Sequence, residues 1–523
     1  MDSIPKIPDI PDEERTPWVT ILLELCHQLR EWVQKLKDEN ARLKGQKARP
    51  SIAPSCLNKE KKEKEPSRRP PHSGKRKKKV AIHRTVKIKP PDLPQGSRFK
   101  GYQDYTVQEI EFQVKNTLFR LERWKTPEGR YLVGELPSDI DGHFGPFLQC
   151  YILYQHHHCH VTQPLILEQL HEWGIEISAG EINNILIKNK EDFHQEKMDI
   201  LKAGLQVSPY IQSDDTGARH DGDNGYCTHI GNESFAWFAS TRSKSRINFL
   251  ELLRAGHEDY VLNAGAFDYM EGQKLPRNVL EDLKALPQKS FDAPGWKMTI
   301  SLMTSERHIR IATEGALLGS ALEHGLNPDL AVMSDDAGQF NILTHILCWI
   351  HAERTVKKLI GFSEEQQEAL GVTLDRIWCF YRELKSYKLA PLQEKKGPLS
   401  QRFDEIFLSK TCFVSLNKAL ERIYKNKEEL LRVLDRPELP LHNNLSEGDI
   451  RDYVKKRKIS GSTRSEEGRR CRDTFASLKK TCRKQKVSFW KYLQDRIFKH
   501  HALPLLSEMI PGVWATSTVS CGV

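Results

Sequence analysis

The chain has 523 residues, of which 38% are hydrophobic and 29% charged, and its formal net charge is +10. This composition is typical of a globular, polar protein with real hydrophobic cores, and at about 150 residues per domain the length allows about two to four domains. No run approaches the ~18 consecutive apolar residues of a transmembrane helix, so we expect no transmembrane span and no membrane partner. The excess of lysine and arginine favours a polyanion such as nucleic acid as partner.

The 11 cysteines are scattered, and no two have the C-x-x-C spacing. The sequence therefore supports neither a zinc ribbon nor a disulfide framework. Reduced thiols are the default in the cytoplasm, where we expect the protein to act. The first five residues are acidic and interrupted by proline, unlike a signal peptide.

Residues 20–44 contain no glycine or proline and carry leucine at every seventh position. The four leucines are Leu22, Leu29, Leu36 and Leu43. A companion position holds Asn40, and one buried asparagine at such a site fixes the register and the dimeric state of a coiled coil. The pattern predicts a short self-associating coiled coil, with a solitary amphipathic helix as the alternative.

Residues 49–98 contain runs of lysine and arginine among prolines, with little to bury. This composition predicts a disordered basic linker, which either adds phosphate contacts or is a solvated spacer. A basic leucine zipper is excluded, because there the basic helix precedes the zipper and runs continuously into it.

Between residues 99 and 205 a small β element precedes several helices. Alternating residues at 117–122 and 130–133, with a turn between them, predict the β element. A helix from Thr162 to Trp173 and a second helix after Ser178 have the outline of a helix-turn-helix. Glu181, three residues after Ser178, completes a capping box.

This helix pair is either a DNA-binding motif or an ordinary helical hairpin. In the first case the second helix carries the groove contacts, for which the candidates are Asn183, Asn184, Lys188 and Lys190. The preceding run His156-His157-His158-Cys159-His160 invites a metal interpretation. On a helix only His156 and His160 share a face, so we expect a polar or phosphate-facing surface instead of a zinc site.

An apolar run from Tyr210 ends in Asp214-Asp215 and breaks at Gly217. Such a pair after a strand is more often part of a turn than of a metal site. Two further predicted strands, 226–230 and 235–241, and a helix at 245–254 follow. Three strands, then a helix, with an acid on the first strand, begin an RNase H-like fold.

The pattern returns at Leu330–Gly338, after a mostly helical insertion: a buried strand ends in Asp335-Asp336. Adjacent parallel strands bring their carboxyl ends together, so Asp214 and Asp335 could share a metal ion. Cys348 and His351 follow, three residues apart. Two ligands do not make a structural zinc site, so we expect packing and hydrogen bonding there.

From about residue 352 to 440 the chain is helical and charged, and a new helix then begins near Leu441. Glu447 lies in its first turns, and basic residues follow it. A Glu447–Arg451 ion pair at i,i+4 spacing is the simplest role for this acid. A basic helix at 466–485 and an amphipathic piece at 489–493 precede the tail.

Four short blocks, in this order, resemble the insertion sequence 66 family of bacterial transposases. They are Ser213–Gly217, Met333–Asp336, Cys348–Arg354, and Asn443–Arg451 followed by Arg457-Lys458. The resemblance covers most of the chain beyond residue 140, and the N-terminal zipper also fits. The chain departs from the family pattern in two ways: it lacks the cysteine-rich region that often follows the zipper, and its insertion before Asp335 is long.

The resemblance implies that Asp214, Asp335 and Glu447 form a D-D-E triad that holds two Mg²⁺ or Mn²⁺ ions. Asp215 and Asp336 are second choices, since neighbouring strand residues point to opposite faces. Arg451, Arg457 and Lys458 would hold DNA phosphates, with a solvated surface as the alternative. Water would nick the element end, and the freed 3′-hydroxyl would then attack target DNA.

The implied fold is α/β in its catalytic core and multidomain α+β overall: an RNase H-like core with a large all-α insertion, preceded by a coiled coil and a mostly helical DNA-binding region. The expected domains are a coiled coil at 1–48, the basic linker at 49–98, the β element and helix-turn-helix-like region at 99–205, the first part of the core at 206–345, the helical insertion at 346–440, the helical part of the core with Glu447 at 441–486, and a tail at 487–523.

The implied function is transposition of an insertion sequence, with DNA ends and target DNA as substrates. Two alternatives remain: a D-D-E nuclease without strand transfer, and an inactive DNA-binding or regulatory relative. We expect a homo-oligomer through residues 20–44, accessory proteins of the element as further candidate partners, and a place at the nucleoid in the bacterial cytoplasm.

Overall fold

The computed structural model describes residues 16, 18–19, 21–26, 28–29, 32–33, 81–110, 112–137, 142–301 and 303–512. The chain divides into two compact units, Met1–Gln113 and Val114–Val523. In the first unit the described residues between 18 and 33 are helical. The rest of the predicted coiled coil, and the linker up to residue 80, lie outside the described residues.

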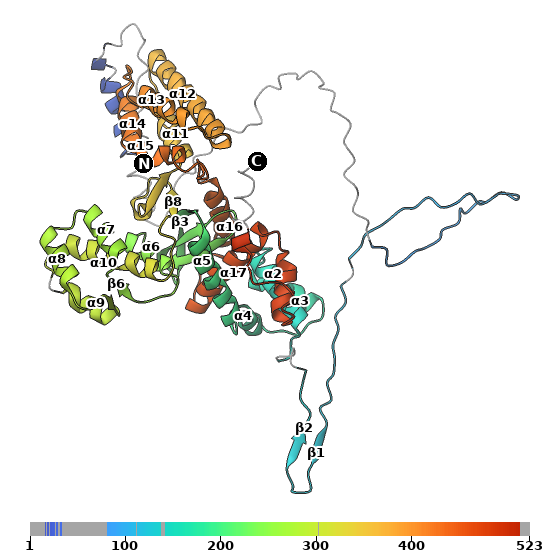
Figure 1. Ribbon diagram of the computed structural model, residues 1–523. Coiled ribbons are helices and arrows are strands. Elements are labelled where there is room, and N and C mark those ends of the chain that lie inside the picture. The colour runs from blue at the N-terminus through green and yellow to red at the C-terminus, as the bar shows by residue number, and fades with distance from the viewer. Residues whose placement is uncertain are drawn as a thin grey trace. The chain divides into compact units, whose positions relative to one another are not determined.

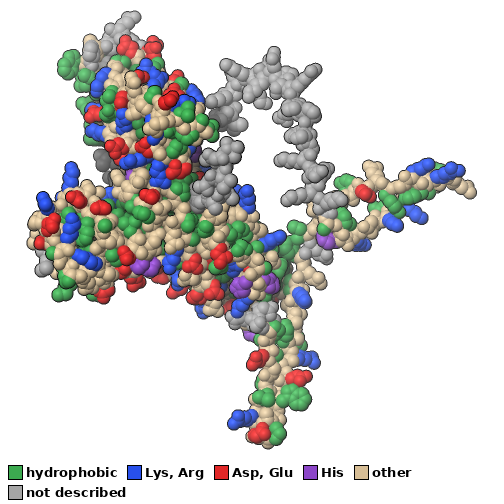
Figure 2. All heavy atoms as spheres, viewed as in Figure 1, with side chains coloured by type: hydrophobic (Ala, Val, Ile, Leu, Met, Phe, Trp, Pro, Cys, Tyr) green, Lys and Arg blue, Asp and Glu red, His purple; other side chains and the backbone are tan. Residues whose placement is uncertain are grey.

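Residues 81–137 contribute to no buried cluster in the described part of the chain. Their large apolar side chains are exposed, and Figure 2 shows hydrophobic and basic side chains along this segment. A small hairpin pairs β1 (Arg123–Lys125) with β2 (Tyr131–Val133). The predicted β element and its turn at residues 126–129 are confirmed, but the first strand is Arg123–Lys125 instead of the alternating stretch at 117–122, because pairing starts directly at the turn.

Four helices follow the hairpin, and the predicted helix pair is among them. They are α2 (Pro146–His157), α3 (Gln163–Glu172), α4 (Ala179–Ile187) and α5 (Glu191–Val207). The side chain of Ser178 accepts a hydrogen bond from the backbone N–H of Glu181 at the start of α4, as the sequence predicted. Between α3 and α4 the chain turns at Gly174, whose φ of +76° suits glycine.

A five-stranded sheet of order β5-β4-β3-β8-β9 forms the centre of the second unit (Figure 1). The strands are β3 (Tyr210–His220), β4 (Asp223–Gly231), β5 (Ala236–Thr241), β8 (Ala331–Ser334) and β9 (Thr344–Leu347). The first three form the predicted antiparallel meander, and α6 (Arg246–Leu253) follows them. β8 pairs in parallel with β3, and β9 in parallel with β8.

A helix covers the free edge of this sheet. β5 pairs only with β4, so alternate N–H groups of β5 face away from the ladder. Side chains one turn apart on α17 (Glu466–Lys484) accept these N–H groups. Asp473 accepts from Ser240, Ser477 from Phe238 and Thr481 from Ala236, at 2.7, 2.9 and 3.1 Å. The outward-facing backbone N–H groups of β5 therefore have hydrogen-bond acceptors without another strand.

Two insertions have hydrophobic cores of their own. The first comprises β6 (Tyr260–Val261), α7 (Ala264–Gly272), α8 (Arg277–Ala285), β7 (Ser290–Phe291), α9 (Ala293–Ile300) and α10 (Glu306–Glu323). The second comprises α11 (Trp349–Lys357), α12 (Glu364–Leu389), α13 (Gln393–Phe407), α14 (Val414–Lys425), α15 (Lys427–Leu431) and the short η4 (Arg432–Leu434). In α14 the buried residues recur at the helical period, which explains why this charged segment still packs.

The remaining elements complete the sheet and its cover. They are η3 (Gly338–Phe340) between β8 and β9, α16 (Asn444–Ser460), α17 and α18 (Phe489–Ile497). The largest buried cluster joins residues of α2–α5, the central strands, α17 and α18. Among the described residues, none of the helices combines the length and the apolar character that a membrane span requires.

Candidate active site

The first two predicted acids lie on neighbouring parallel strands: Asp335 directly follows the end of β8, whereas Asp214 lies inside β3. The sequence predicted that the first strand ends at Asp214-Asp215 and breaks at Gly217, but β3 continues to His220 because its pairing with β4 extends that far. Gln212 of β3 is aligned with Met333 of β8, so Asp214 and Asp335 each stand two residues beyond an aligned pair. Because the strands run parallel, both acids lie at the same level of the sheet, just beyond the stretch in which β3 pairs with β8. The structure thus brings together two carboxylates that are separated by more than a hundred residues of sequence.

The third acid, Glu447, lies in the first turn of α16. Two hydrogen bonds tie the start of this helix to β3, immediately before Asp214. The side-chain amide of Asn443 donates to the carbonyl oxygen of Ser213 at 3.1 Å, and the N–H of Ser446 donates to the side-chain oxygen of Gln212 at 3.3 Å. Glu447 is therefore held beside the part of β3 that precedes Asp214.

The electrostatics of Asp214 reflect this convergence. Burial, together with the negative charges of Asp335, Asp215 and Glu447, raises the pKa of Asp214 to about 6. A hydrogen bond of 2.7 Å from the N–H of Asp215 opposes the shift. Carboxylates that repel each other in this way are stabilised by a cation between them.

The two neighbouring acids have other partners. Asp215 accepts hydrogen bonds from the hydroxyl of Thr228 at 2.5 Å and the side-chain amide of Gln339 at 2.9 Å. Asp336 forms an ion pair of 2.5 Å with Arg422.

By contrast, the hydrogen bonds that Asp214 and Asp335 accept come from the backbone in the described part of the chain, at Asp215 and Ala337 respectively. Their remaining lone pairs favour these two acids as metal ligands over Asp215 and Asp336.

Glu447 has a cationic partner that the sequence did not predict. Its Oε1 accepts a hydrogen bond of 3.2 Å from Nη1 of Arg354, and Nε2 of His351 lies 3.7 Å from the same oxygen. Both residues belong to α11, whose spacing of His351 and Arg354 places them one turn apart. The i,i+4 pair of Glu447 with Arg451 does not appear among the ion pairs of the described residues.

Cys348 has a structural role rather than a zinc-binding one. The residue is buried, and its Sγ accepts a hydrogen bond of 3.2 Å from the N–H of Asn443. The N–H of Trp349 donates to the carbonyl oxygen of Leu441 at 3.0 Å. These bonds connect the start of α11 to the segment that leads into α16, which is how Arg354 comes to face Glu447.

The described residues contain no group of three or more His, Cys, Asp or Glu side chains arranged to hold a metal ion. Glu447 is engaged with Arg354 and His351. The donor chemistry nevertheless suits Mg²⁺ or Mn²⁺, which prefer carboxylate oxygens. The crowding of negative charge around Asp214 also fits a cation.

A second unpredicted residue, His229, connects the strands to α16. His229 is the antiparallel partner of Asp214 on β4 and is fully buried. Its Nδ1 lies 2.7 Å from the hydroxyl of Ser446, and its Nε2 lies 3.2 Å from Asp449. Ser446 and Asp449 flank Glu447, so this histidine fixes the helix relative to Asp214. The spacing of Ser446 and Asp449 on one helical face was the only sequence signal.

The three basic candidates on α16 are differently exposed. Arg451 and Lys458 are exposed. Arg457 is half-buried, and its Nη1 donates a hydrogen bond of 3.3 Å to the hydroxyl of Thr216, two residues beyond Asp214. Arg457 is thus the candidate phosphate ligand that lies nearest to the acids along β3.

The candidates around α4 require a correction. The helix ends at Ile187, so Lys188 and Lys190 do not lie on it, and Lys190 is buried with its Nζ bound to the carbonyl oxygen of Lys188 at 2.6 Å. Lys188 is exposed. Asn184 donates to Glu181 at 3.2 Å, and Asn183 accepts from Gln163 at 3.5 Å.

The histidine run also differs from the expectation. α2 ends at His157 and His160 has a φ of +64°, so His156 and His160 do not share a helical face. His157 is buried and stacks on Phe475 with ring centroids 4.2 Å apart. The run is therefore only partly a surface: His157 packs in the core and His158 is exposed, and the predicted phosphate-facing role stays a prediction.

Comparison with known proteins identifies similar sequences. Residues 328–470 match the model of a family described as "Transposase IS66 family". The chain is also 43% identical over 303 residues to the uncharacterized protein y4jO of Sinorhizobium fredii (strain NBRC 101917 / NGR234). That alignment covers 57% of this chain and 94% of y4jO. The matched family region contains Asp335, Arg354 and Glu447 and does not reach Asp214.

Proposed function

The chain belongs to the IS66 family of transposases, and from this premise we propose that it cleaves DNA at the ends of an insertion sequence and joins those ends to target DNA. Asp214, Asp335 and Glu447 would carry both steps. The observation that supports this assignment most strongly is the parallel pairing of β3 with β8, since Asp214 and Asp335 each stand two residues beyond the aligned pair Gln212–Met333, and Asn443 ties the start of α16 to Ser213.

The three carboxylates would hold two divalent ions, Mg²⁺ or Mn²⁺. When bound, such a pair stabilises the attacking and leaving oxygens of an in-line displacement at phosphorus. Asp214 and Asp335 offer oxygen lone pairs that no side chain of the described residues occupies. Arg354 contacts only Oε1 of Glu447, so it fixes the orientation of the carboxylate and leaves Oε2 for a ligand.

The reaction has two displacements. In the first, water attacks a phosphodiester at the element end, and the DNA strand leaves as a 3′-hydroxyl. In the second, that hydroxyl attacks a target phosphodiester, and the target's own 3′-oxygen leaves with the proton. Arg457, next to Thr216, and the exposed Arg451 and Lys458 would hold the DNA phosphates on either side.

The same proposal extends to the other parts of the chain. We propose that the sheet with α6, α16 and α17 is an RNase H-like core, interrupted by the helical insertion at 346–440. Residues 20–44 would join copies as a coiled coil, and the α3–α4 pair would contact DNA through Asn183, Asn184 and Lys188. The protein would act at the nucleoid of a bacterial cytoplasm.

A strand-transfer assay tests the proposal. The purified chain is incubated with a pre-cleaved element-end oligonucleotide, target DNA and Mg²⁺ or Mn²⁺, and joined products are resolved on a denaturing gel. Joined product is expected. Cleavage of an uncut end without joining would identify a nuclease instead, and DNA binding without cleavage would identify a regulatory relative.

Substitutions then test the three carboxylates. Asp214→Ala, Asp335→Ala and Glu447→Ala should each reduce joining by a factor of at least about 10³ while DNA binding is nearly unchanged, since each removes an oxygen ligand. Asp282→Ala, at an exposed position of α8, is the matched control and should behave as wild type. Full activity in any of the three variants would overturn the assignment of that residue.

A further inference from the structure

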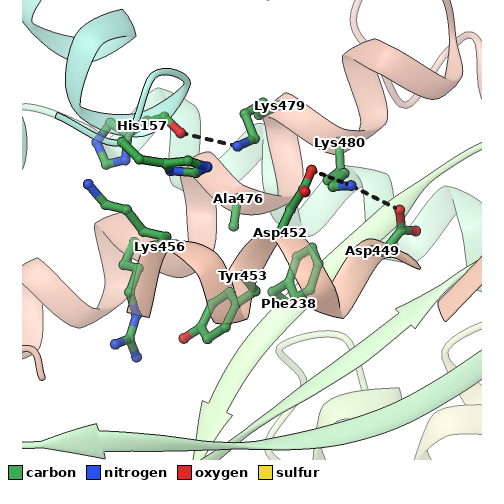
Figure 3. A pocket seen from close by; sticks show the side chains of 11 residues that line it. His157, Phe238, Asp449, Asp452, Tyr453, Lys456, Ala476, Lys479 and Lys480 are labelled. Atoms are coloured by element: carbon green, nitrogen blue, oxygen red, sulfur yellow. Dashed lines mark hydrogen bonds and ion pairs between the residues drawn. The ribbon is translucent and has the colours of Figure 1, made fainter. Parts of the chain in front are cut away.

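A small cavity lies among α2, α16 and α17, away from Asp214, Asp335 and Glu447; charged side chains surround it, and the surface exposed inside it is mostly carbon. Its walls include His157 and His160 near the end of α2, and Lys456, Arg472 and Lys479 from the other helices. Figure 3 shows Lys456 and Lys479 beside His157 at this place. The volume of about 20 Å³ exceeds the ~10–15 Å³ that one water molecule needs. The cavity thus admits one small group and no nucleotide base.

The cavity carries an excess of positive charge. Four cationic side chains line it, against the two carboxylates of Asp449 and Asp452. Lys480 neutralises these carboxylates, with its Nζ 2.7 Å from Asp452 and 3.5 Å from Asp449. Just outside the cavity Lys484 pairs with Asp449 at 2.8 Å, and Asp473 lies 3.5 Å from Arg472. The two other cations, Lys456 and Lys479, therefore have no matching carboxylate in the wall.

The end of α2 provides one hydrogen-bond acceptor each for Lys456 and Lys479. Nζ of Lys456 donates to the carbonyl oxygen of His156 at 2.6 Å, and Nζ of Lys479 donates to that of His157 at 3.3 Å. Cations commonly bind the free carbonyl groups at a helix C-terminus. An ammonium group has three N–H bonds, however, so each lysine keeps further donors for another acceptor.

Other buried polar atoms of the wall are poorly satisfied. Arg472 and His157 are each only 8% exposed, yet Nη1 of Arg472 and Nε2 of His157 lack hydrogen-bond partners among the described residues, and Nε of Arg472 has only its ion pair of 3.5 Å with Asp473. Nδ1 of His160 also lacks a hydrogen-bond partner among the described residues. A buried polar group without a partner costs about 1–3 kcal/mol. One acceptor-rich group in the cavity would satisfy several of these donors together.

We propose that this cavity is a binding site for a phosphate oxyanion, either free inorganic phosphate or a backbone phosphate of DNA. A phosphate group offers several acceptor oxygens and the negative charge that the wall lacks. Burial, with repulsion from Lys479 and Arg472, lowers the pKa of Lys456 to about 7. Burial also lowers the pKa of Lys479 to about 8. A bound anion would restore the protonated form of both.

The site is separate from the carboxylates. Glu447 and Lys456 are nine residues apart on α16, which at about 100° per residue places them on opposite faces of the helix. Asp449, Asp452 and Tyr453 share the face of Lys456. The proposal therefore stands independently of the metal site and of strand transfer.

Titration with inorganic phosphate tests the site. The melting temperature of the full chain is measured against sodium phosphate and, at equal ionic strength, sodium chloride. Phosphate should raise it in the millimolar range beyond the effect of chloride. The double variant Lys456→Gln, Lys479→Gln keeps an N–H donor for each α2 carbonyl but removes both charges, so its phosphate dissociation constant should rise at least tenfold. Lys491→Gln, exposed on α18, is the matched control.

An identical phosphate response in the double variant and the control, or a wild-type response no larger than that to chloride, would overturn the proposal. If the double variant does not fold, Lys479→Gln alone replaces it. Acetylation footprinting of the wild-type protein gives an independent reading: phosphate should protect Lys479, and unchanged labelling would contradict the site.

A further experiment with duplex DNA identifies the source of the phosphate. If a backbone phosphate enters the cavity, duplex DNA should abolish the phosphate-dependent stabilisation, and the double variant should bind DNA more weakly than Lys491→Gln does. If free phosphate is the ligand, DNA affinity should be equal in both variants while phosphate binding is still lost. Using the inactive Asp214→Ala protein for this arm separates its outcome from that of catalysis.

Discussion

The charge on Asp214 should destabilise the metal-free protein, and its removal should therefore stabilise it. The usual pKa of 3.8 is raised to about 6, mainly by burial and then by the neighbouring carboxylates. At ~1.4 kcal/mol per pKa unit, this shift corresponds to about 3 kcal/mol. The side chain is half-buried, so solvent screening reduces the expected effect to about 1–2 kcal/mol.

The sign follows from proton binding. Between pH 4 and 6 the folded protein holds a proton on Asp214 that the unfolded chain has released, so wild-type stability falls as the pH rises through this window. Asp214→Asn carries no charge and keeps an oxygen for the N–H of Asp215. The variant should match wild type near pH 4 and exceed it at pH 7.5, by roughly 2–6 °C in the melting temperature of the core.

The assay is thermal unfolding with EDTA at both pH values, followed by the same measurement with Mg²⁺. Magnesium at ten times its dissociation constant should stabilise wild type by about 1.4 kcal/mol and leave Asp214→Asn nearly unchanged. Asp282→Asn, exposed on α8, controls for the loss of a surface charge. A difference that is independent of pH, or equal stabilisation of wild type and Asp214→Asn by Mg²⁺, would refute the reasoning.

Three further predictions concern other parts of the chain. Arg354→Ala should lower strand transfer at least tenfold and weaken Mg²⁺ binding without changing DNA affinity, because Glu447 loses its orienting partner. Arg354→Lys should recover part of the strand transfer and of the Mg²⁺ binding. Unchanged metal affinity in Arg354→Ala would contradict this role. Deleting residues 1–48 should convert the oligomer to a monomer in light scattering, and an unchanged mass would exclude the coiled coil as the contact. Ser477→Ala should destabilise the core by about 1–2 kcal/mol in urea unfolding, since it leaves the buried N–H of Phe238 without an acceptor, whereas an unaltered midpoint would show that water replaces the hydroxyl.

Local signals in the sequence were sufficient for most helices and for the meander. The Ser178 cap, the regular apolar spacing in the insertion at 346–440 and the strands around Asp214 are all encoded by residues within a few positions of each other. The same local reading misplaced the first strand of the hairpin and extended the second helix of the pair to Lys190. Turn geometry at residues 126–129 and the backbone at Lys188 decided those boundaries.

Only the tertiary structure decided which side chains meet. The sequence by itself determined that Asp335 follows a buried strand, that Asp214 lies on another strand and that Glu447 lies in the first turn of a helix. It wrongly ended the strand of Asp214 near Gly217, because the pairing with β4 that carries β3 to His220 has no local signal. The parallel pairing of β3 with β8, the contact of Arg354 with Glu447 and the burial of His157 depend on segments about ninety to three hundred residues apart. The spacing of apolar residues along an element shows which face of it is buried. Which other element packs on that face depends on tertiary packing, and no local sequence pattern predicts it.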